Sequence, residues 1–354
     1  MNFLITLLIL FIILSVIIIV HEFGHFIAAK KGGVYIDEFS LGMGPQLLKY
    51  KPKKSETTYS LRAFPIGGFV SMAEKEDHSN KAIKKNQVLE NKSFGRKLLV
   101  LINGILFNCF LAIFLFFISG LFYGRPVSEP VINKVVEGMA AEQAGLSKVV
   151  YATQEANGVK INTWDDFLLE ASAKKLKDEY IFKIEKSNGD IKEYNLVPEV
   201  QEVEGQEVKV FGIQSSGTTY YKGFKNAVIY AFEGFYTNFK TIFKILGNLF
   251  TGEVPVKSLS GPVGIYSLVD SVKSQGLNTL LYLTAYLSIN VAIINLIPIP
   301  VFDGGRVLIL LIEKITRKKS SENLEAILNY IGFGLMILLM LYVTFNDIIK
   351  LVVK

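Results

Sequence analysis

Long uncharged runs dominate the chain and predict helices that cross a membrane. Four stretches contain no Lys, Arg, Asp or Glu: Met1–Val20, Leu98–Gly124, Ser274–Phe302 and Ala326–Asn346. Each approaches or exceeds the roughly 20 residues that a helix needs to cross a hydrocarbon core about 30 Å thick. The first run has no basic start and no small-residue cleavage site, so we interpret it as a retained helix rather than a signal peptide. The pattern predicts four transmembrane segments.

A fifth apolar stretch, Phe224–Phe250, follows a different pattern. It contains Lys225, Glu233, Lys240 and Lys244, while its apolar residues recur at helical spacing. Charged groups on one side and apolar groups on the other predict an amphipathic helix that lies on the membrane surface.

The polar segment between the first two runs has strand character. Val34–Met72 contains the β-prone stretch Thr57–Phe64, and Pro65–Gly68 is a turn signal before Phe69. Two interpretations are open. The segment is either an ordinary cytoplasmic hairpin or a β-loop that dips into the membrane, with an edge that accepts an extended peptide.

The long segment after the second run alternates short strand and helix patterns, which predicts one compact α/β domain. We expect a helix at Met139–Ala144, a turn at Asn157–Gly158 and a second helix at Trp164–Lys175. The expected strands are Val131–Val135, Val159–Ile161, and the pair Tyr180–Glu185 and Lys192–Leu196 around a turn at Asn188–Gly189.

Composition agrees with a membrane protein that also has parts in water. The chain has 354 residues, of which 50% are hydrophobic and 20% charged, with a mean hydropathy of +0.36. These values exclude intrinsic disorder and collagen. The single cysteine, Cys109, excludes a disulfide framework within the chain and a CxxC zinc ribbon.

The distribution of charge predicts how the chain is oriented. Lys30–Lys97 contains 14 Lys or Arg and 7 Asp or Glu, and Glu313–Glu325 contains four basic residues, whereas Tyr123–Gly276 contains 17 basic and 19 acidic residues. The positive-inside rule places the two basic loops in the cytoplasm, and both termini and the middle segment outside. The basic residues flank the spans and no base-stacking motif accompanies them, so a nucleic-acid surface is not indicated.

The first span runs into a metal-binding pattern, His21-Glu22-Phe23-Gly24-His25. Residues four apart share one face of a helix, so both imidazoles can reach one metal ion, with Glu22 beside them as general base to a water that the metal activates. Polar groups at the end of an apolar span are costly in lipid and need partners. Asn103 and Asn108, in the second span, are expected to hydrogen-bond to other helices.

The third span ends in a second polar motif that supplies a candidate third ligand. Pro298 and Pro300 must break or kink the helix, and Asp303 follows at once with two glycines. Irregular backbone at this depth is tolerated only when it packs in protein or lines a wet cavity. Asp303 is either a third zinc ligand or a helix-capping aspartate. Spans one and three run in the same direction, so Asp303 and the histidines are expected at similar depth on the cytoplasmic side.

These two motifs resemble the site-2 protease family of intramembrane zinc metalloproteases, and in particular its bacterial RseP/RasP-like branch. His21–His25 matches the family's HExxH, and Asn295–Gly305 (NLIPIPVFDGG) matches NxxPxPxLDG, with Phe302 where leucine is usual. Further similarity lies in Phe39–Pro45, Pro65–Val70 and Ser260–Ile265. The resemblance covers nearly the whole chain.

The resemblance implies an α-helical polytopic membrane protein that hydrolyses peptide bonds in transmembrane segments. It implies one Zn²⁺ bound by His21, His25 and Asp303, with Glu22 as catalytic base. It also implies substrate binding by a group of residues made up of Asn295, Pro298, Gly67, Gly68 and Phe69. The implied substrates are single-pass membrane proteins, trimmed first by another protease, in a bacterial inner membrane; anti-sigma factors and remnant signal peptides are the usual classes.

The middle domain resembles a PDZ domain, although the Gly-Asp pair usually found after Gly-Leu is missing. It is expected either to bind a peptide carboxylate or to filter substrates by size. The rival function is a non-catalytic zinc-binding membrane scaffold that acts through this domain. A transporter is not supported, since no internal repeat is found.

The expected division of the chain follows from these patterns and is, in order: 1–29, first transmembrane helix; 30–97, cytoplasmic β-loop region; 98–124, second transmembrane helix; 125–200, external PDZ-like domain; 201–273, external linker with the amphipathic helix; 274–312, third transmembrane segment; 313–325, cytoplasmic loop; 326–354, fourth transmembrane helix.

Overall fold

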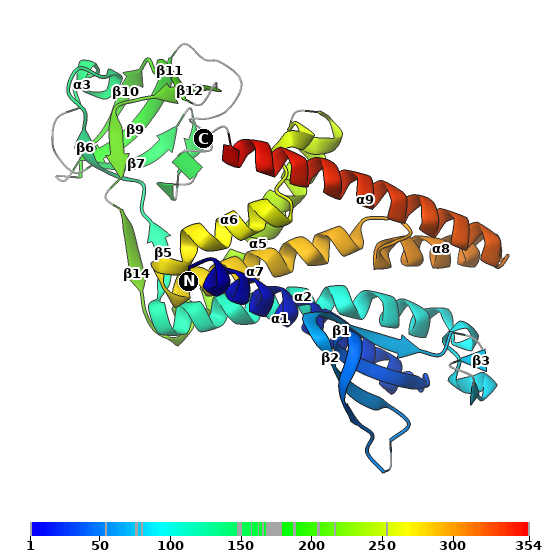
Figure 1. Cartoon of the computed structure of the whole chain (residues 1–354). Coiled ribbons are helices and arrows are strands. Elements are labelled where there is room, and N and C mark those ends of the chain that lie inside the picture. The colour runs from blue at the N-terminus through cyan, green and yellow to red at the C-terminus, as the bar shows by residue number, and fades with distance from the viewer. Residues whose placement is uncertain are drawn as a thin grey trace. The chain divides into compact units, whose positions relative to one another are not determined.

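A computed structural model of the chain separates into two compact units (Figure 1). The first combines Met1–Ser119 with Val228–Lys354, and the second is Gly120–Ala227. The structure describes residues 2–53, 55–74, 77–78, 81–146, 151–156, 158–161, 163–164, 166–167, 179–186, 189–203, 206–215, 217–252 and 254–352.

Among the described residues, the first unit contains four helices long and apolar enough to cross a membrane, as the uncharged runs predict. They are α1 (Asn2–Lys31), α2 (Phe94–Tyr123), α7 (Leu277–Leu296) and α9 (Glu322–Val352). Helix α1 continues well past the uncharged run, so the His21–His25 motif lies inside the helix and not beyond its end.

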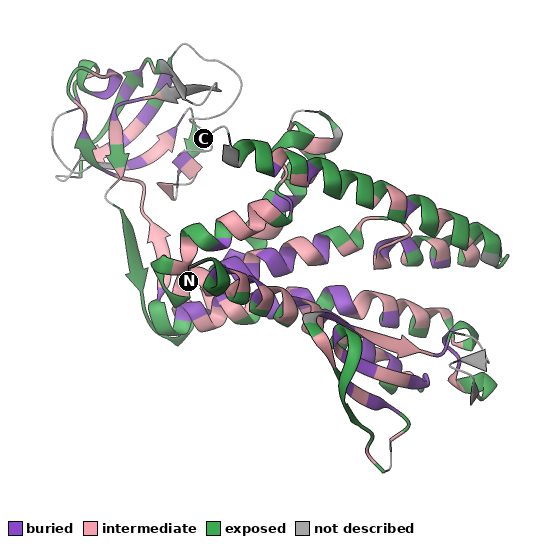
Figure 2. Ribbon diagram, in the orientation of Figure 1, coloured by how far each residue is buried: buried purple, intermediate pink, exposed green. Residues whose placement is uncertain are grey.

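Burial identifies α7 as the central helix of this group (Figure 2). In the most apolar stretch of each helix, 44% of the residues are buried in α7 but only 11% in α9, whose surface is covered with exposed large apolar side chains. An apolar surface of this extent is stable against lipid and not against water. The chain is thus a multi-pass membrane protein.

Helices α5 and α6 also belong to this unit. Helix α5 (Phe224–Phe250) has the predicted bounds and buries Ala231 and Ile242 against Phe116 and Ile289; its place on the membrane surface remains a prediction. Helix α6 (Pro262–Val272) was not predicted as a separate element. It contacts α1, α7 and α9.

The third predicted segment is divided by a break. Helix α7 ends at Leu296, and α8 (Asp303–Thr316) begins after six residues that contain both prolines. Helix α8 ends at Thr316 and is followed by Arg317, which has a left-handed backbone with φ of 57°. Since α9 begins at Glu322, most of the predicted loop Glu313–Glu325 is helical.

Two long strands, β1 (Ile36–Tyr50) and β2 (Thr58–Met72), follow α1 and form the predicted β region. β2 stays extended through Pro65–Gly68, but the chain reverses there as the turn signal predicts, because Leu61 and Gly68 both pair with Leu41 of β1 and Gly67 has a φ of 81°. Phe39 of β1 is paired with both Val70 and Tyr59, so the two strands fold back on each other. Short strands β3 (Asp77–His78) and β4 (Lys81–Ala82) follow.

The second unit is built around a sheet in the order β10-β9-β7-β6-β13, with β8 paired to β7. Its elements are β6 (Val131–Val135), α3 (Ala140–Gln143), β7 (Tyr151–Ala156), β8 (Val159–Lys160), β9 (Tyr180–Lys186), β10 (Ile191–Leu196) and β13 (Ile213–Ser215). Outside this sheet, β5 (Arg125–Ser128) pairs with β14 (Thr218–Tyr221), and β11 (Glu199–Val203) pairs with β12 (Gln206–Val210).

Aromatic residues form the core of this unit. Tyr180 and Phe182 of β9 pack edge-on against Phe211, with ring centroids 5.1 and 5.5 Å apart. Phe211 and β13 therefore belong to this unit, which extends beyond the expected limit of Val200 and takes residues assigned to the linker 201–273. Residues 157, 168–175 and 188 of the predicted turns and second helix lie outside the described residues.

Candidate active site

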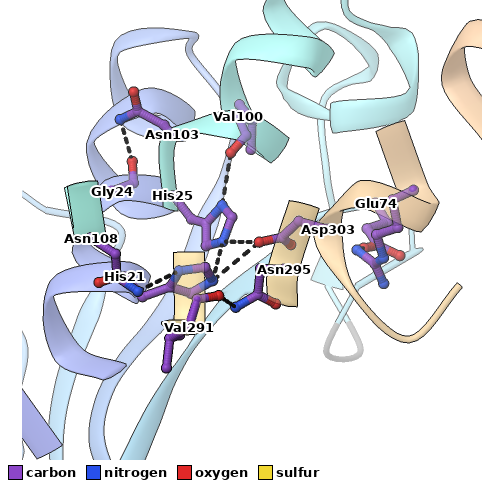
Figure 3. A network of polar contacts seen from close by, with 11 residues as sticks. His21, Gly24, His25, Glu74, Val100, Asn103, Asn108, Val291, Asn295 and Asp303 are labelled. Carbon is purple, nitrogen blue, oxygen red and sulfur yellow. Dashed lines mark hydrogen bonds and ion pairs between the residues drawn. The ribbon is translucent and has the colours of Figure 1, made fainter. Parts of the chain in front are cut away.

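Two histidines and one aspartate converge between α1 and α8 (Figure 3). His21 and His25 lie one turn apart on α1, and Asp303 is the first residue of α8. Oδ2 of Asp303 is 3.1 Å from Nε2 of His21 and 3.3 Å from Nε2 of His25, and the two Nε2 atoms are 3.2 Å apart. The three residues predicted as metal ligands are thus brought together.

The arrangement fits a tetrahedral zinc ion. Bonds of about 2.0–2.1 Å to nitrogen and oxygen separate the ligands of a tetrahedron by roughly 3.3 Å, close to all three measured distances. Oδ2 of Asp303 is also buried without a hydrogen-bond partner among the described residues. When both Nε2 atoms are unprotonated, three lone pairs face one another and repel unless a cation lies between them. Three ligands leave the fourth tetrahedral position for water or substrate.

Helix α2 contacts the imidazole rings of His21 and His25 at their Nδ1 atoms. Nδ1 of His25 lies 2.7 Å from the carbonyl oxygen of Val100, to which a ring N–H donates, and this leaves the Nε2 lone pair directed into the site. Nδ1 of His21 lies 3.4 Å from the side-chain nitrogen of Asn108. Gly104, between these two residues, leaves room for both rings, because a Cβ there would lie 2.4 Å from Nε2 of His25.

The break before α8 places Asp303 opposite the histidines. A Cβ at Gly304 would lie 2.3 Å from the carbonyl oxygen of Leu296, and one at Gly305 would lie 2.2 Å from that of Ile299, so only glycine permits this fold. No side chain caps the helix at Phe302, and the Asp303 carboxylate faces the histidines. Arg306, one turn further, pairs with Glu74 at 3.0 Å and ties α8 to the segment after β2.

Glu22 lies between the histidines and β2. Its carboxylate is close enough for the charges of His21, His25 and Asp303 to act on it, and it contacts the backbone of Val70 by a hydrogen bond. A Cβ at Gly68 would lie 4.0 Å from Cγ of Glu22, in ordinary contact. The candidate base therefore separates the metal ligands from the strand edge at residues 68–70.

The other predicted substrate residues lie around this edge. Gly67 and Gly68 are buried, and a Cβ at Gly67 would contact Ile18 of α1. Phe69 is half-buried, with the guanidinium of Arg62 4.9 Å from its ring. Arg62 in turn forms an ion pair of 2.7 Å with Glu38. This pair and the stacked ring fix the shape of β2 next to Glu22.

Asn295 and Pro298 come from the end of α7 and the break. The side-chain nitrogen of Asn295 donates to the carbonyl oxygen of Val291 at 3.0 Å (Figure 3). Pro298 is exposed. The contacts of both residues allow a role toward substrate, but that role remains a prediction.

Sequence reasoning missed the contribution of α2 to the site. Asn103 donates to the carbonyl oxygen of Gly24 at 2.7 Å, which confirms the expected bond to another helix. Asn108 also reaches another helix as expected, through Nδ1 of His21 on α1 at 3.4 Å; what was missed is that this partner is a candidate metal ligand. The signal was present in the spacing, because Gly104 and Asn108 are four residues apart and so share one face of α2.

A buried HExxH pair and a carboxylate inside a group of apolar helices are the features of a membrane-embedded metallopeptidase. Residues 9–339 match Peptidase family M50. A protein of Clostridium acetobutylicum that is named as a zinc metalloprotease is 34% identical over 338 residues, covering 95% of each chain. The Regulator of sigma-W protease RasP of Bacillus subtilis is 30% identical over 417 residues, covering 96% of this chain and 97% of RasP.

A zinc metalloprotease RasP of Oceanobacillus iheyensis is 29% identical over 418 residues, with 95% of this chain and 97% of the relative covered. The chain belongs to Peptidase family M50, the site-2 protease family. It is an intramembrane zinc metalloprotease of the RseP/RasP-like branch.

Proposed function

We propose that His21, His25 and Asp303 hold one zinc ion and that Glu22 is the catalytic base of an intramembrane endopeptidase. The observation that carries the proposal is the position of Glu22. Its side chain lies against Gly68 and Val70 of β2, within reach of the charges of all three ligands. Base, metal ligands and an extended strand edge therefore meet at one point.

The chemistry follows from these positions. Zinc, when bound, supplies Lewis-acid activation of a water molecule and of the scissile carbonyl group. Glu22 accepts the proton from the attacking water and passes it to the amide nitrogen of the leaving peptide. The helices around the site, α1, α2 and α7, exclude bulk water and strengthen the electrostatic interactions within it.

The substrate must be extended where it is cut. A helix hides its backbone because its amides are already hydrogen-bonded, so a transmembrane substrate has to unwind locally. The edge of β2 at Gly67, Gly68 and Phe69 would bind this segment by strand addition. Asn295 and Pro298 would contact the substrate from the other side of the site. Helix-breaking residues near the cleavage point should favour cleavage.

The proposed substrates are single-pass membrane proteins cut near their cytoplasmic end. The basic segments Lys30–Lys97 and Glu313–Glu325 support an orientation with the site toward the cytoplasm and with the termini and the second unit outside. The proposed location is the cytoplasmic (inner) membrane of a bacterium. The sigma-W regulator named for the Bacillus subtilis relative makes anti-sigma factors one candidate class, beside remnant signal peptides.

The unit Gly120–Ala227 is proposed to be a PDZ-like domain. Its described strands and its short helix α3 support this. A folded domain outside the membrane would exclude substrates with large external parts, so another protease would have to trim them first. Binding of a peptide carboxylate is the alternative role for the same domain.

The decisive experiment compares Glu22→Gln with the wild type. The purified proteins are incubated in detergent with a model single-pass substrate, and bound zinc is measured in parallel. We expect the variant to retain zinc and lose cleavage. Cleavage by Glu22→Gln at the wild-type rate would exclude Glu22 as the base. A zinc-binding scaffold, the rival function, would show no cleavage even by the wild type.

The ligand set is tested separately by zinc content. Asp303→Ala should bind less zinc than the wild type, because two histidines alone leave half of a tetrahedral site to water. Asp303→Asn is the matched variant, since it keeps the size of the side chain and removes its charge. Unchanged zinc affinity in Asp303→Ala would remove Asp303 from the ligand set.

A further inference from the structure

The proposed ligand set leaves the hydrogen-bond partner of Nδ1 of His21 unassigned. If Nε2 of His21 binds zinc, the ring proton is on Nδ1, and a buried N–H group requires an acceptor. His25 meets this requirement through the carbonyl oxygen of Val100. His21 is only 8% exposed, so bulk water does not provide the acceptor.

Asn108 is the polar group next to this atom. Its side-chain nitrogen lies 3.4 Å from Nδ1 of His21, and the residue is completely buried. Its side-chain oxygen has no hydrogen-bond partner among the described residues. The hydroxyl of Ser288 on α7 donates to the backbone oxygen of Asn108 at 2.9 Å, which holds this part of α2 in place.

The orientation of the Asn108 carboxamide decides which ring nitrogen is available to a metal. With the nitrogen toward His21, Nδ1 must accept and the ring proton must be on Nε2, which blocks zinc binding. A half-turn of the carboxamide places its oxygen against Nδ1 instead. In the described part of the chain the oxygen has no partner to lose, so the rotation gives up only the contact of the nitrogen with Nδ1 of His21.

We propose that Asn108 is a positioning residue whose side-chain oxygen accepts the Nδ1 proton of His21 and so commits Nε2 to zinc. The inference rests on the proposed ligand set and adds the partner that orients one of its members. A carboxamide performs this task without adding charge to a site that already contains Asp303 and Glu22. Asn108 and Val100, both on α2, then each accept the Nδ1 proton of one histidine.

Zinc affinity is the measurement that tests this role, by competition with a chromogenic chelator in detergent. Asn108→Leu keeps the approximate size of the side chain and removes the acceptor, and we expect the affinity to fall about 10–100-fold. Asn108→Asp keeps an acceptor oxygen and should retain most of the affinity. A purely structural role predicts equal losses for both variants, and that result would overturn the proposal.

Ser119→Ala is the control. Ser119 is buried on the same helix, and its hydroxyl donates to the side-chain oxygen of Asn278 on α7 at 2.6 Å, eleven residues along α2 from Asn108. We expect this variant to lower the thermal unfolding temperature and to leave zinc affinity unchanged. A loss of zinc affinity equal to that of Asn108→Leu would also overturn the proposal.

A second measurement uses the wild-type protein and does not depend on the folding of any variant. The chain has only three histidines, so ring-¹⁵N-labelled histidine gives few signals in NMR spectra of the zinc-loaded protein. We expect the His21 proton on Nδ1, and a proton on Nε2 would refute the role of Asn108. Failure of the ligand set has a different signature, since His21→Ala would then bind zinc as tightly as the wild type.

Discussion

Gly104→Ala should abolish tight zinc binding although Gly104 touches no substrate and carries no functional group. The added Cβ would lie 2.4 Å from Nε2 and 2.7 Å from Cε1 of His25, and 2.8 Å from Cε1 of His21. Ordinary contacts begin at about 3.4 Å, so one side must move by about 1 Å. Metal ligands tolerate displacements of only about 0.2 Å.

Neither side can move easily. Helix α2 cannot separate from α1 without cost, because the two helices already touch at Gly24, where a Cβ would lie 2.4 Å from the carbonyl oxygen of Asn103. The rings cannot swing without breaking the bond of His25 to Val100. We expect zinc affinity to fall by at least about 100-fold, and stability without zinc to fall by about 1–3 kcal/mol.

The assay is chelator competition on the detergent-purified protein, with thermal unfolding recorded in the absence of zinc. Gly95→Ala is the control, because it adds the same methyl group to the same helix with nothing within 4 Å. The control should bind zinc normally and be stabilised by up to about 1 kcal/mol. Wild-type zinc affinity in a folded Gly104→Ala protein would show that the close approach of α2 is not part of the site.

Three further predictions concern the structure around the site and in the second unit. Gly305→Ala would place a Cβ 2.2 Å from a carbonyl oxygen of the break before α8, and should lose zinc and proteolysis, whereas Gly334→Ala, with nothing within 4 Å, should keep both. Asp347 is buried and accepts two backbone N–H groups at the start of α6, each at 2.8 Å. Asp347→Asn should therefore lower stability by about 1.5–3 kcal/mol in thermal unfolding and leave zinc affinity unchanged. The hydrogen bond and charge of Glu155 raise the pKa of Lys183. The stabilisation of the fold by this pair is therefore complete below the unfolded-state pKa of about 10.4 and is lost as the pH rises through the folded-state pKa. Glu155→Gln should remove this alkaline loss in thermal unfolding at rising pH, and an unchanged profile would contradict the assignment.

The sequence determined the helices of this protein because their signals are local. An uncharged run of membrane-crossing length can satisfy its backbone only as a helix, which is why α1, α2, α7 and α9 were predictable. The amphipathic pattern of α5 was equally local. Two motifs with distinct chemistry also indicated His21, His25 and Asp303 as candidate ligands, and the structure brings these three residues together.

The limits of the second unit depended on contacts that are distant in the chain. Phe211 belongs to the aromatic core of a unit that was expected to end at Val200. No sequence pattern in residues 201–215 predicts this packing. The turn signal at Pro65–Gly68 was correct in that the chain reverses there, since Leu61 and Gly68 both pair with Leu41. Only the tertiary pairing with β1 keeps this segment extended.

The surroundings of the metal ligands were decided only by the tertiary structure. Val100, Gly104 and Asn108 support the two histidines, yet they lie more than 70 residues away in the chain. The sequence names the groups that bind a metal because coordination chemistry restricts the residue types. It does not identify the carbonyl group of Val100, the missing side chain of Gly104 or the carboxamide of Asn108 as the groups around the histidines. Nearly any residue offers a backbone carbonyl, and many offer a small or polar side chain. Those roles arise from the close approach of α2 to α1.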